Sequence, residues 1–279
     1  MVASISMLWL LPLFSTTVSA QTAYNPEKTL SIGIILFPGF QPLDVIGPLD
    51  IIQTLSGTYN MTLSMIWKET GPVWARSPPR QTPPNPNATI PPAIYPIQAP
   101  HILATHTFDT APPLDILLVP GGMGNRVLHE NNDTVMEDFV AARYGSGELQ
   151  YLLSVCTGAG TLAKSGVLNG RRATTNKAAW AWPTQFGEGV KWVPTARWTE
   201  DGNIWTSSGV SAGIDMTYAF LRKFFGPVAV DRVLNAMEYT PHLDEHWDPY
   251  SVVHKVPGAD TSRPLGDCVG PVGYEIKCQ

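Results

Sequence analysis

Residues 150–160 read QYLLSVCTGAG, and the rest of the chain can be interpreted outward from this stretch. The apolar run predicts a buried strand, and the apolar pattern over residues 161–164 predicts a helix directly after it. Cys156 lies at the sharp turn between them, where Gly158 and Gly160 allow a tight bend and close packing of the helix on the sheet. A side chain there projects near free N–H groups at the helix N-terminus, which favour a thiolate. We therefore interpret Cys156 as a candidate nucleophile; the alternative is a buried, inert cysteine.

Two further apolar runs, residues 30–37 and 114–119, predict buried parallel strands that each end in a proline-glycine turn. A helix is expected after the first turn, over residues 43–55, with Asp44 at its N-terminus as a favourable cap. The second turn, Pro120 to Gly124, has neither a P-loop lysine nor a dinucleotide fingerprint, so phosphate binding is not expected. Its glycines can instead bring backbone N–H groups close to a reacting atom.

The remaining elements alternate along the chain and predict one α/β domain over residues 21–279, with a mostly parallel sheet covered by helices on both faces. Asp201-Gly202 predicts a hairpin turn. The other expected strands cover residues 61–67, 101–108, 172–175, 190–199 and 204–207, and the other expected helices cover residues 132–143, 176–182, 214–225 and 227–239.

Three segments are expected to lie outside the regular α/β pattern. Residues 1–20 contain an apolar stretch followed by Val18 and Ala20, which fit a signal-peptidase site, so we expect a cleaved signal peptide and a secreted protein with no membrane contact after cleavage. Residues 74–100 are a proline-rich insertion, and residues 240–279 form a C-terminal tail. Export is supported by three glycosylation sequons, at Asn60, Asn87 and Asn132.

The chain has three cysteines. Cys268 and Cys278 lie in the Gly/Pro-rich tail, where an oxidising compartment would favour a disulfide between them. Cys156 is then left unpaired, which is consistent with a reactive thiol.

Composition argues against several functional classes. The net charge is −5 and no basic run occurs, so nucleic-acid binding is not expected. His242 and His246 are spaced as metal ligands on a helix would be, but Pro241 and the acidic surroundings favour a solvated loop. We expect neither a metal nor another cofactor.

Several of the turns together resemble a known family. In order, FPGFQPLDVIGPLD, VPGGMG, SVCTGAG and SSGVSAGID, with RRATT after the elbow helix, are similar to the DJ-1/PfpI superfamily, and more closely to its isocyanide hydratase-like branch. The resemblance covers residues 31–225 without the insertion. It implies a flavodoxin-like three-layer sandwich with a cysteine nucleophile elbow, a small electrophilic substrate and a homodimer.

The resemblance also assigns roles to particular residues. Cys156 matches the family nucleophile, and Asp44 matches the acidic residue that faces it. Gly122 and Thr157 match the pair whose backbone N–H groups form the oxyanion pocket. The implied reaction is hydration of an isocyanide to an N-substituted formamide, with thiolate attack assisted by a carboxyl whose pKa is raised by the nearby negative charge.

One position departs from the family pattern. Asn176 follows the paired threonines where the family commonly has histidine, and an asparagine cannot exchange a proton at neutral pH. Three alternatives stay open: a non-catalytic or redox-sensitive secreted thiol protein, a glutaminase-type amidotransferase using Cys156 with His242 and Asp244, and a glyoxalase-like hydrolase.

Overall fold

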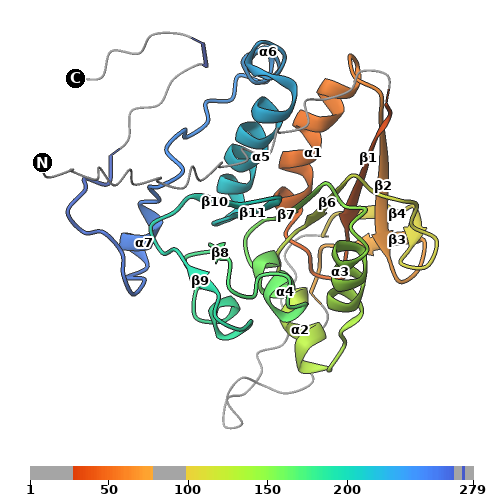
Figure 1. The fold of residues 1–279 in the computed structure, drawn as a ribbon, viewed down its shortest axis with the longest axis horizontal. Coiled ribbons are helices and arrows are strands. Elements are labelled where there is room, and N and C mark those ends of the chain that lie inside the picture. Colours follow the sequence, from red (N-terminus) through yellow and green to blue (C-terminus); the bar gives the residue numbers. More distant parts are fainter. Residues whose placement is uncertain (1–27, 78–98, 267–271, 274–279) are drawn as a thin grey trace, which may run out of the picture.

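The central sheet has seven strands in the order β10-β11-β7-β6-β1-β2-β5 in the computed structural model, which describes residues 28–77, 99–266 and 272–273 (Figure 1). Neighbouring strands run parallel except for the edge pair β10–β11. Asp201 and Gly202 connect that pair as the predicted hairpin turn. The strands are β1 (Leu30–Ile35), β2 (Met61–Trp67), β5 (His106–Thr107), β6 (Ile116–Val119), β7 (Tyr151–Ser154), β10 (Trp198–Asp201) and β11 (Ile204–Ser207).

Helices cover both faces of this sheet, as the alternating pattern predicts. On one face α1 packs against α5 and α6, and on the other α3 packs against α4 (Figure 1). The helices are α1 (Pro42–Ser56), α2 (Gly124–Glu130), α3 (Val135–Gly145), α4 (Gly158–Lys164), α5 (Val210–Phe225), α6 (Pro227–Ala236) and α7 (Tyr250–Val253). The protein is therefore a flavodoxin-like α/β sandwich.

The chain leaves β1 and β6 in opposite directions across the sheet, because β1 leads to β2 on one side and β6 leads to β7 on the other. Ligands in open α/β sheets bind at the carboxyl ends of strands around such a switch point. The turns that follow β1, β6 and β7 meet at this edge, and they carry Asp44, Gly122 and Cys156.

The segment between α4 and β11 differs from the sequence-based expectation. Residues 176–182 form turns rather than a helix, followed by a short 3-10 helix, η1 (Pro183–Gln185). The amide oxygen of Asn176 accepts the Ala179 N–H at 2.9 Å, which closes a turn, and Pro183 has no N–H to continue a helix. The expected strand over residues 190–199 is interrupted by Pro194. Its first part, β9 (Lys191–Trp192), pairs with β8 (Arg172–Ala173) away from the main sheet.

The helix expected over residues 132–143 begins later, at Val135, and a separate helix, α2, precedes it. Asn132 takes a left-handed conformation (φ 55°), which interrupts the helical path between the two. The predictions for α5 and α6 were also wrong at one end: α5 begins at Val210 rather than Ile214, and α6 ends at Ala236 rather than Tyr239.

The proline-rich insertion leaves and rejoins the domain through a two-stranded ladder, β3 (Gly71–Trp74) with β4 (His101–Ala104). The Ala75 N–H donates to Pro100 O at 2.9 Å and extends this ladder. Most of the insertion, the predicted signal peptide, Asn87, Cys268 and Cys278 lie outside the described residues. Among the described helices, none is both long and apolar enough to cross a bilayer.

Candidate active site

Cys156 occupies a strained turn between β7 and α4. Its φ is 58°, a left-handed conformation that is unfavourable for a residue with a side chain. Two hydrogen bonds hold this backbone: the Cys156 N–H donates to Ser208 O at 2.9 Å, and Thr175 Oγ1 donates to Cys156 O at 2.8 Å. The thiol is free and buried. The predicted elbow is therefore present, and segments distant in sequence maintain it.

The elbow lies directly against the turn that follows β6. A Cβ atom placed on Gly121 would lie 2.6 Å from Thr157 N and 3.0 Å from Cys156 Cβ. A Cβ on Gly158 would lie 2.2 Å from Val119 O. Only glycine fits at either position without displacing backbone atoms.

Asp44 lies in the first turn of α1 and is fully buried. Its Oδ2 accepts the Gly121 N–H at 2.9 Å, and the Cys156 thiol is the other group that hydrogen-bonds to the carboxyl. Burial raises the pKa of the Asp44 carboxyl to about 7, against smaller opposing effects of the Gly121 N–H and the Cys156 side chain. The sequence argument expected a raised pKa because of a neighbouring thiolate, but desolvation is the main cause.

The sequence argument expected the N-terminus of α4 to favour a Cys156 thiolate, but the pKa of the thiol is shifted in the opposite direction. Its pKa is raised, first by burial and then by the negative charge of Asp44. The Thr157 N–H, the Asn176 amide and the Thr157 hydroxyl lower it, but by less than burial raises it. That prediction was wrong because the helix effect was considered without desolvation, which disfavours any anion in this pocket. Burial and the charge of Asp44 thus favour the protonated thiol over the thiolate.

The two predicted N–H donors are arranged differently from each other. The Gly122 N–H donates to Thr157 Oγ1 at 3.0 Å, so in this structure it is engaged with the elbow, and an oxyanion role would require that bond to break. The Thr157 N–H interacts with the Cys156 sulfur.

Sequence reasoning missed Asn125, which is fully buried beside this pair. Its Nδ2 donates to Thr157 O at 3.1 Å and lies 3.2 Å from Thr157 Oγ1. Asn125 belongs to α2, the helix that the sequence did not predict, and no neighbouring pattern identifies it as buried.

Asn176 stands where a family histidine was expected. Because its Oδ1 accepts the Ala179 N–H, its amide NH₂ group remains to interact with the Cys156 sulfur. The groups that act on the thiol are thus Asp44, Thr157 and Asn176. His242 lies in the loop between α6 and α7, where its N–H donates to Asp215 Oδ1 at 3.3 Å. Within residues 28–77, 99–266 and 272–273, no three His, Cys, Asp or Glu side chains gather as metal ligands would.

Comparisons with known proteins identify relatives of this chain. The model of the DJ-1/PfpI family matches residues 87–223. The chain is 32% identical over 216 residues to an isonitrile hydratase from Pseudomonas putida, covering 76% of this chain and 79% of that protein. It is 34% identical over 120 residues to a deglycase from Pyrococcus horikoshii, covering 42% of this chain and 66% of the deglycase.

A similar solved structure is that of a ThiJ/PfpI family protein from Pseudomonas syringae. The TM-score is 0.60 at 23% sequence identity, and the match covers 82% of this chain and 85% of that one.

Proposed function

Because the chain belongs to the DJ-1/PfpI family, we propose that it is a cysteine-dependent hydratase that converts an isocyanide, R–N≡C, into an N-substituted formamide, R–NH–CHO. The observation that carries this proposal is the buried pair of Cys156 and Asp44. Burial raises the pKa of both side chains, so that the thiol keeps its proton while Asp44 ionises near neutral pH and becomes able to accept it. The isonitrile hydratase similarity supports the choice of substrate.

In the first proposed step, Asp44 accepts the thiol proton as Cys156 attacks the terminal carbon of the isocyanide. The C–S bond forms, and Asp44 returns the proton to the same carbon, which gives a thioimidate, R–N=CH–S–Cys. Asp44 suits this role because the Cys156 thiol hydrogen-bonds to its carboxyl and its pKa lies near neutral pH. The Asn176 amide and the Thr157 N–H stabilise negative charge on sulfur.

In the second proposed step, water adds to the thioimidate carbon and the C–S bond breaks. Asp44 takes a proton from the water, the substrate nitrogen gains one, and the thiol is re-formed. The sum is addition of one water molecule to the isocyanide, with no change in oxidation state of the protein. Gly122 and Asn125 contribute by holding Thr157, since both donate to its polar atoms.

Incubation with a small alkyl isocyanide, followed by mass spectrometry of the formamide, tests the proposal. We expect the wild type to produce formamide and Cys156→Ala to lose roughly a thousandfold or more of the rate, since the nucleophile is removed. Equal rates in the two proteins would contradict the mechanism. Absence of turnover in the wild type would favour the alternative of a non-catalytic or redox-sensitive thiol protein.

We further propose, on sequence grounds, that the protein is secreted, that Cys268 and Cys278 form a disulfide, and that it assembles as a homodimer. Asn60 and Asn132 are exposed, as glycosylation acceptors must be. The exposed Leu43 and Ile46, on either side of Asp44 along the chain, are compatible with a subunit contact near the site.

A further inference from the structure

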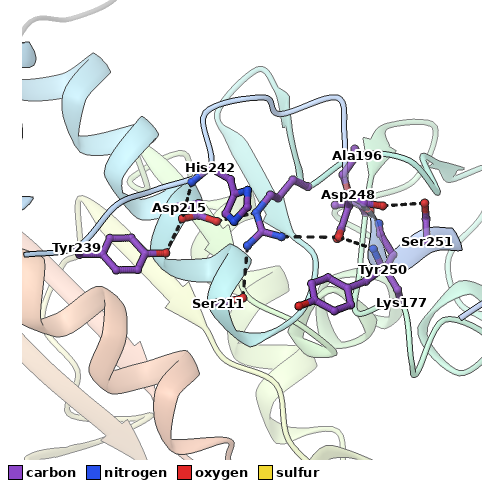
Figure 2. Close-up of polar contacts among 11 residues, drawn as sticks. Lys177, Ala196, Ser211, Asp215, Tyr239, His242, Asp248, Tyr250 and Ser251 are labelled. Carbon is purple, nitrogen blue, oxygen red and sulfur yellow. Dashed lines mark hydrogen bonds and ion pairs between the residues drawn. The ribbon is translucent and has the colours of Figure 1, made fainter. Parts of the chain in front are cut away.

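A pocket of about 180 Å³ is lined in part by Asn176, and the proposed hydration assigns no role to the charged residues that also line it. Its lining includes Lys177, Arg197 and Asp248, which are almost completely buried. Tyr250 and His254 are exposed and form the rim, so the pocket has a buried charged floor and an open mouth. Figure 2 shows the polar contacts around Lys177 and Asp248.

The hydrogen bonds of Lys177 match a neutral amine. Its Nζ donates to Thr174 Oγ1 at 2.6 Å and to Ala196 O at 2.8 Å. A neutral amine has two N–H groups and a lone pair, so these two acceptors satisfy its donors and leave the lone pair uncommitted. A protonated amine would have a third N–H, for which the described residues offer the face of the Trp180 ring, 5.0 Å from Nζ to the ring centroid, and no oxygen acceptor.

The surrounding charges are consistent with this state. Burial, partly opposed by the charge of Asp248 and assisted by that of Arg197, lowers the pKa of Lys177 to about 7. Arg197 is itself paired, with its Nε 2.6 Å from Asp215 Oδ2 and its Nη1 3.7 Å from Asp248 Oδ1. Asp248 Oδ2 is buried and accepts no hydrogen bond from a described residue. On the rim, the ionisable groups are Tyr250 and His254.

The same pocket is lined by the start of α5, residues 208–212. Gly209 offers no side-chain cap to this 16-residue helix, so the first backbone N–H groups have no side-chain cap among the described residues. Such a helix start favours a carboxylate. The pocket thus combines a nucleophilic amine with a place for an anion.

We propose that Lys177 forms a reversible imine with a small aldehyde or ketone that carries a carboxylate, a 2-oxo acid. The amine lone pair attacks the carbonyl carbon and the carbonyl oxygen gains a proton, which gives a carbinolamine. Loss of a proton from nitrogen and of the hydroxyl as water then forms the C=N bond. The sum is R–CO–COO⁻ plus Lys–NH₂ giving the imine plus water, with solvent exchanging the protons and no oxidant or reductant consumed.

Reductive trapping tests this site without any isocyanide. The wild-type protein is incubated at pH 7 with glyoxylate and sodium cyanoborohydride, which reduces any imine to a stable carboxymethyl adduct, and the peptides are analysed by mass spectrometry. The exposed Lys255 serves as the internal reference. We expect Lys177 to be labelled at least roughly tenfold faster than Lys255, because an exposed lysine amine is mostly protonated at pH 7.

Isobutyraldehyde, which has the same number of non-hydrogen atoms as glyoxylate but no carboxylate, is the matched probe and is expected to label Lys177 more slowly. The Cys156→Ala variant should be labelled like the wild type, which shows that the thiol does not deliver the aldehyde. Labelling of Lys177 no faster than Lys255 would overturn the proposal. Equal labelling by the two aldehydes would overturn the choice of an acidic carbonyl compound. Failure of isocyanide hydration would leave these results unchanged.

Discussion

Asp44 and Cys156 share a pocket in which burial raises the pKa of both side chains. Because the charge of Asp44 further raises the pKa of the thiol, the pair keeps one proton after Asp44 has ionised. Asp44 becomes ionised near neutral pH and can then accept the thiol proton during attack. The site depends on this exchange rather than on a permanently ionised thiolate.

Asp44→Asn tests this at the level of activity. We expect the wild-type kcat/KM to rise with pH as Asp44 ionises, with a midpoint at about 7, and to fall about tenfold per pH unit below it. The variant should lose roughly a hundredfold or more and should lose that rise, since an amide accepts no proton. An unchanged pH profile in the variant would contradict the role of Asp44.

Asp44→Asn also has a consequence for stability. The carboxyl pKa is about 7 in the folded protein and 3.8 in the reference state, so the folded protein retains a proton that the unfolded chain loses. Stability therefore falls as pH rises from about 4 to 7, and then levels off. Asparagine keeps an acceptor for the Gly121 N–H without this penalty. The unfolding free energy of the variant minus that of the wild type should therefore be larger at pH 8 than at pH 4, by at most about 4 kcal/mol. Urea unfolding at the two pH values measures this difference.

Substitution of Asn176 tests how the thiol is polarised. The amide lowers the pKa of the Cys156 thiol, so Asn176→Ala should slow alkylation by iodoacetamide at any given pH. Asn176→His places a group that titrates near pH 6.5 beside the sulfur, and the pH dependence of alkylation should then show an additional ionisation. Superimposable profiles for the three proteins would mean that residue 176 does not act on the thiol.

At the scale of elements, the turn after β6 and the elbow after β7 form one packed unit. Gly121 contributes an N–H to Asp44, and its α-carbon faces Thr157 and Cys156 too closely to carry a side chain. Gly122 and Asn125 add hydrogen bonds to Thr157. The geometry of the candidate nucleophile thus depends on a turn that lies more than thirty residues earlier in the chain.

Gly121→Ala and Gly145→Ala form a matched pair of substitutions. The first places a methyl group 2.6 Å from Thr157 N and should destabilise the protein by roughly 2 kcal/mol or more, with loss of activity. The second lies at the end of α3, where nothing stands within 4 Å, and should change stability by less than about 1 kcal/mol. Urea unfolding of both variants gives the comparison, and equal effects would show that the close approach is not structurally important.

At the scale of the whole molecule, a buried charge cluster ties the C-terminal segment to α5. Arg197 pairs with Asp215 of α5 and Asp248 of the segment before α7, and Tyr239 donates to Asp215 Oδ1 at 2.5 Å (Figure 2). Arg197 and Asp248 of this cluster also line the Lys177 pocket. The tail predicted from sequence as residues 240–279 is therefore, over its described part, integrated into the domain.

Arg197→Met tests the contribution of this cluster. It leaves two buried aspartates without their counter-charge and should destabilise the protein by roughly 3–5 kcal/mol. Lys223→Met, which removes the ion pair with Glu200 from a partly exposed surface, should cost less than about 1 kcal/mol. Chemical unfolding separates the two, and a small effect at Arg197 would mean that the aspartates are protonated or hydrated when unpaired.

The amino-acid sequence alone determined the elements whose signal is local. The apolar runs over residues 30–37, 114–119 and 149–155 specify buried strands, because a strand covered on both faces needs apolar side chains at every position. The glycines after Cys156 specify a sharp turn for the same local reason. These features, with the family resemblance, were enough to place Cys156 and Asp44 at one edge of the sheet.

Tertiary structure decided everything that depends on which groups surround an atom. Burial, not the helix N-terminus, governs the Cys156 and Asp44 pKa values, and Thr157 takes up the Gly122 N–H. The sequence does not show that Lys177 and Asp248 line one pocket, because seventy residues separate them. Desolvation and hydrogen-bond partnership arise from contacts between distant segments, so a local pattern can place a nucleophile in a turn but cannot state its charge.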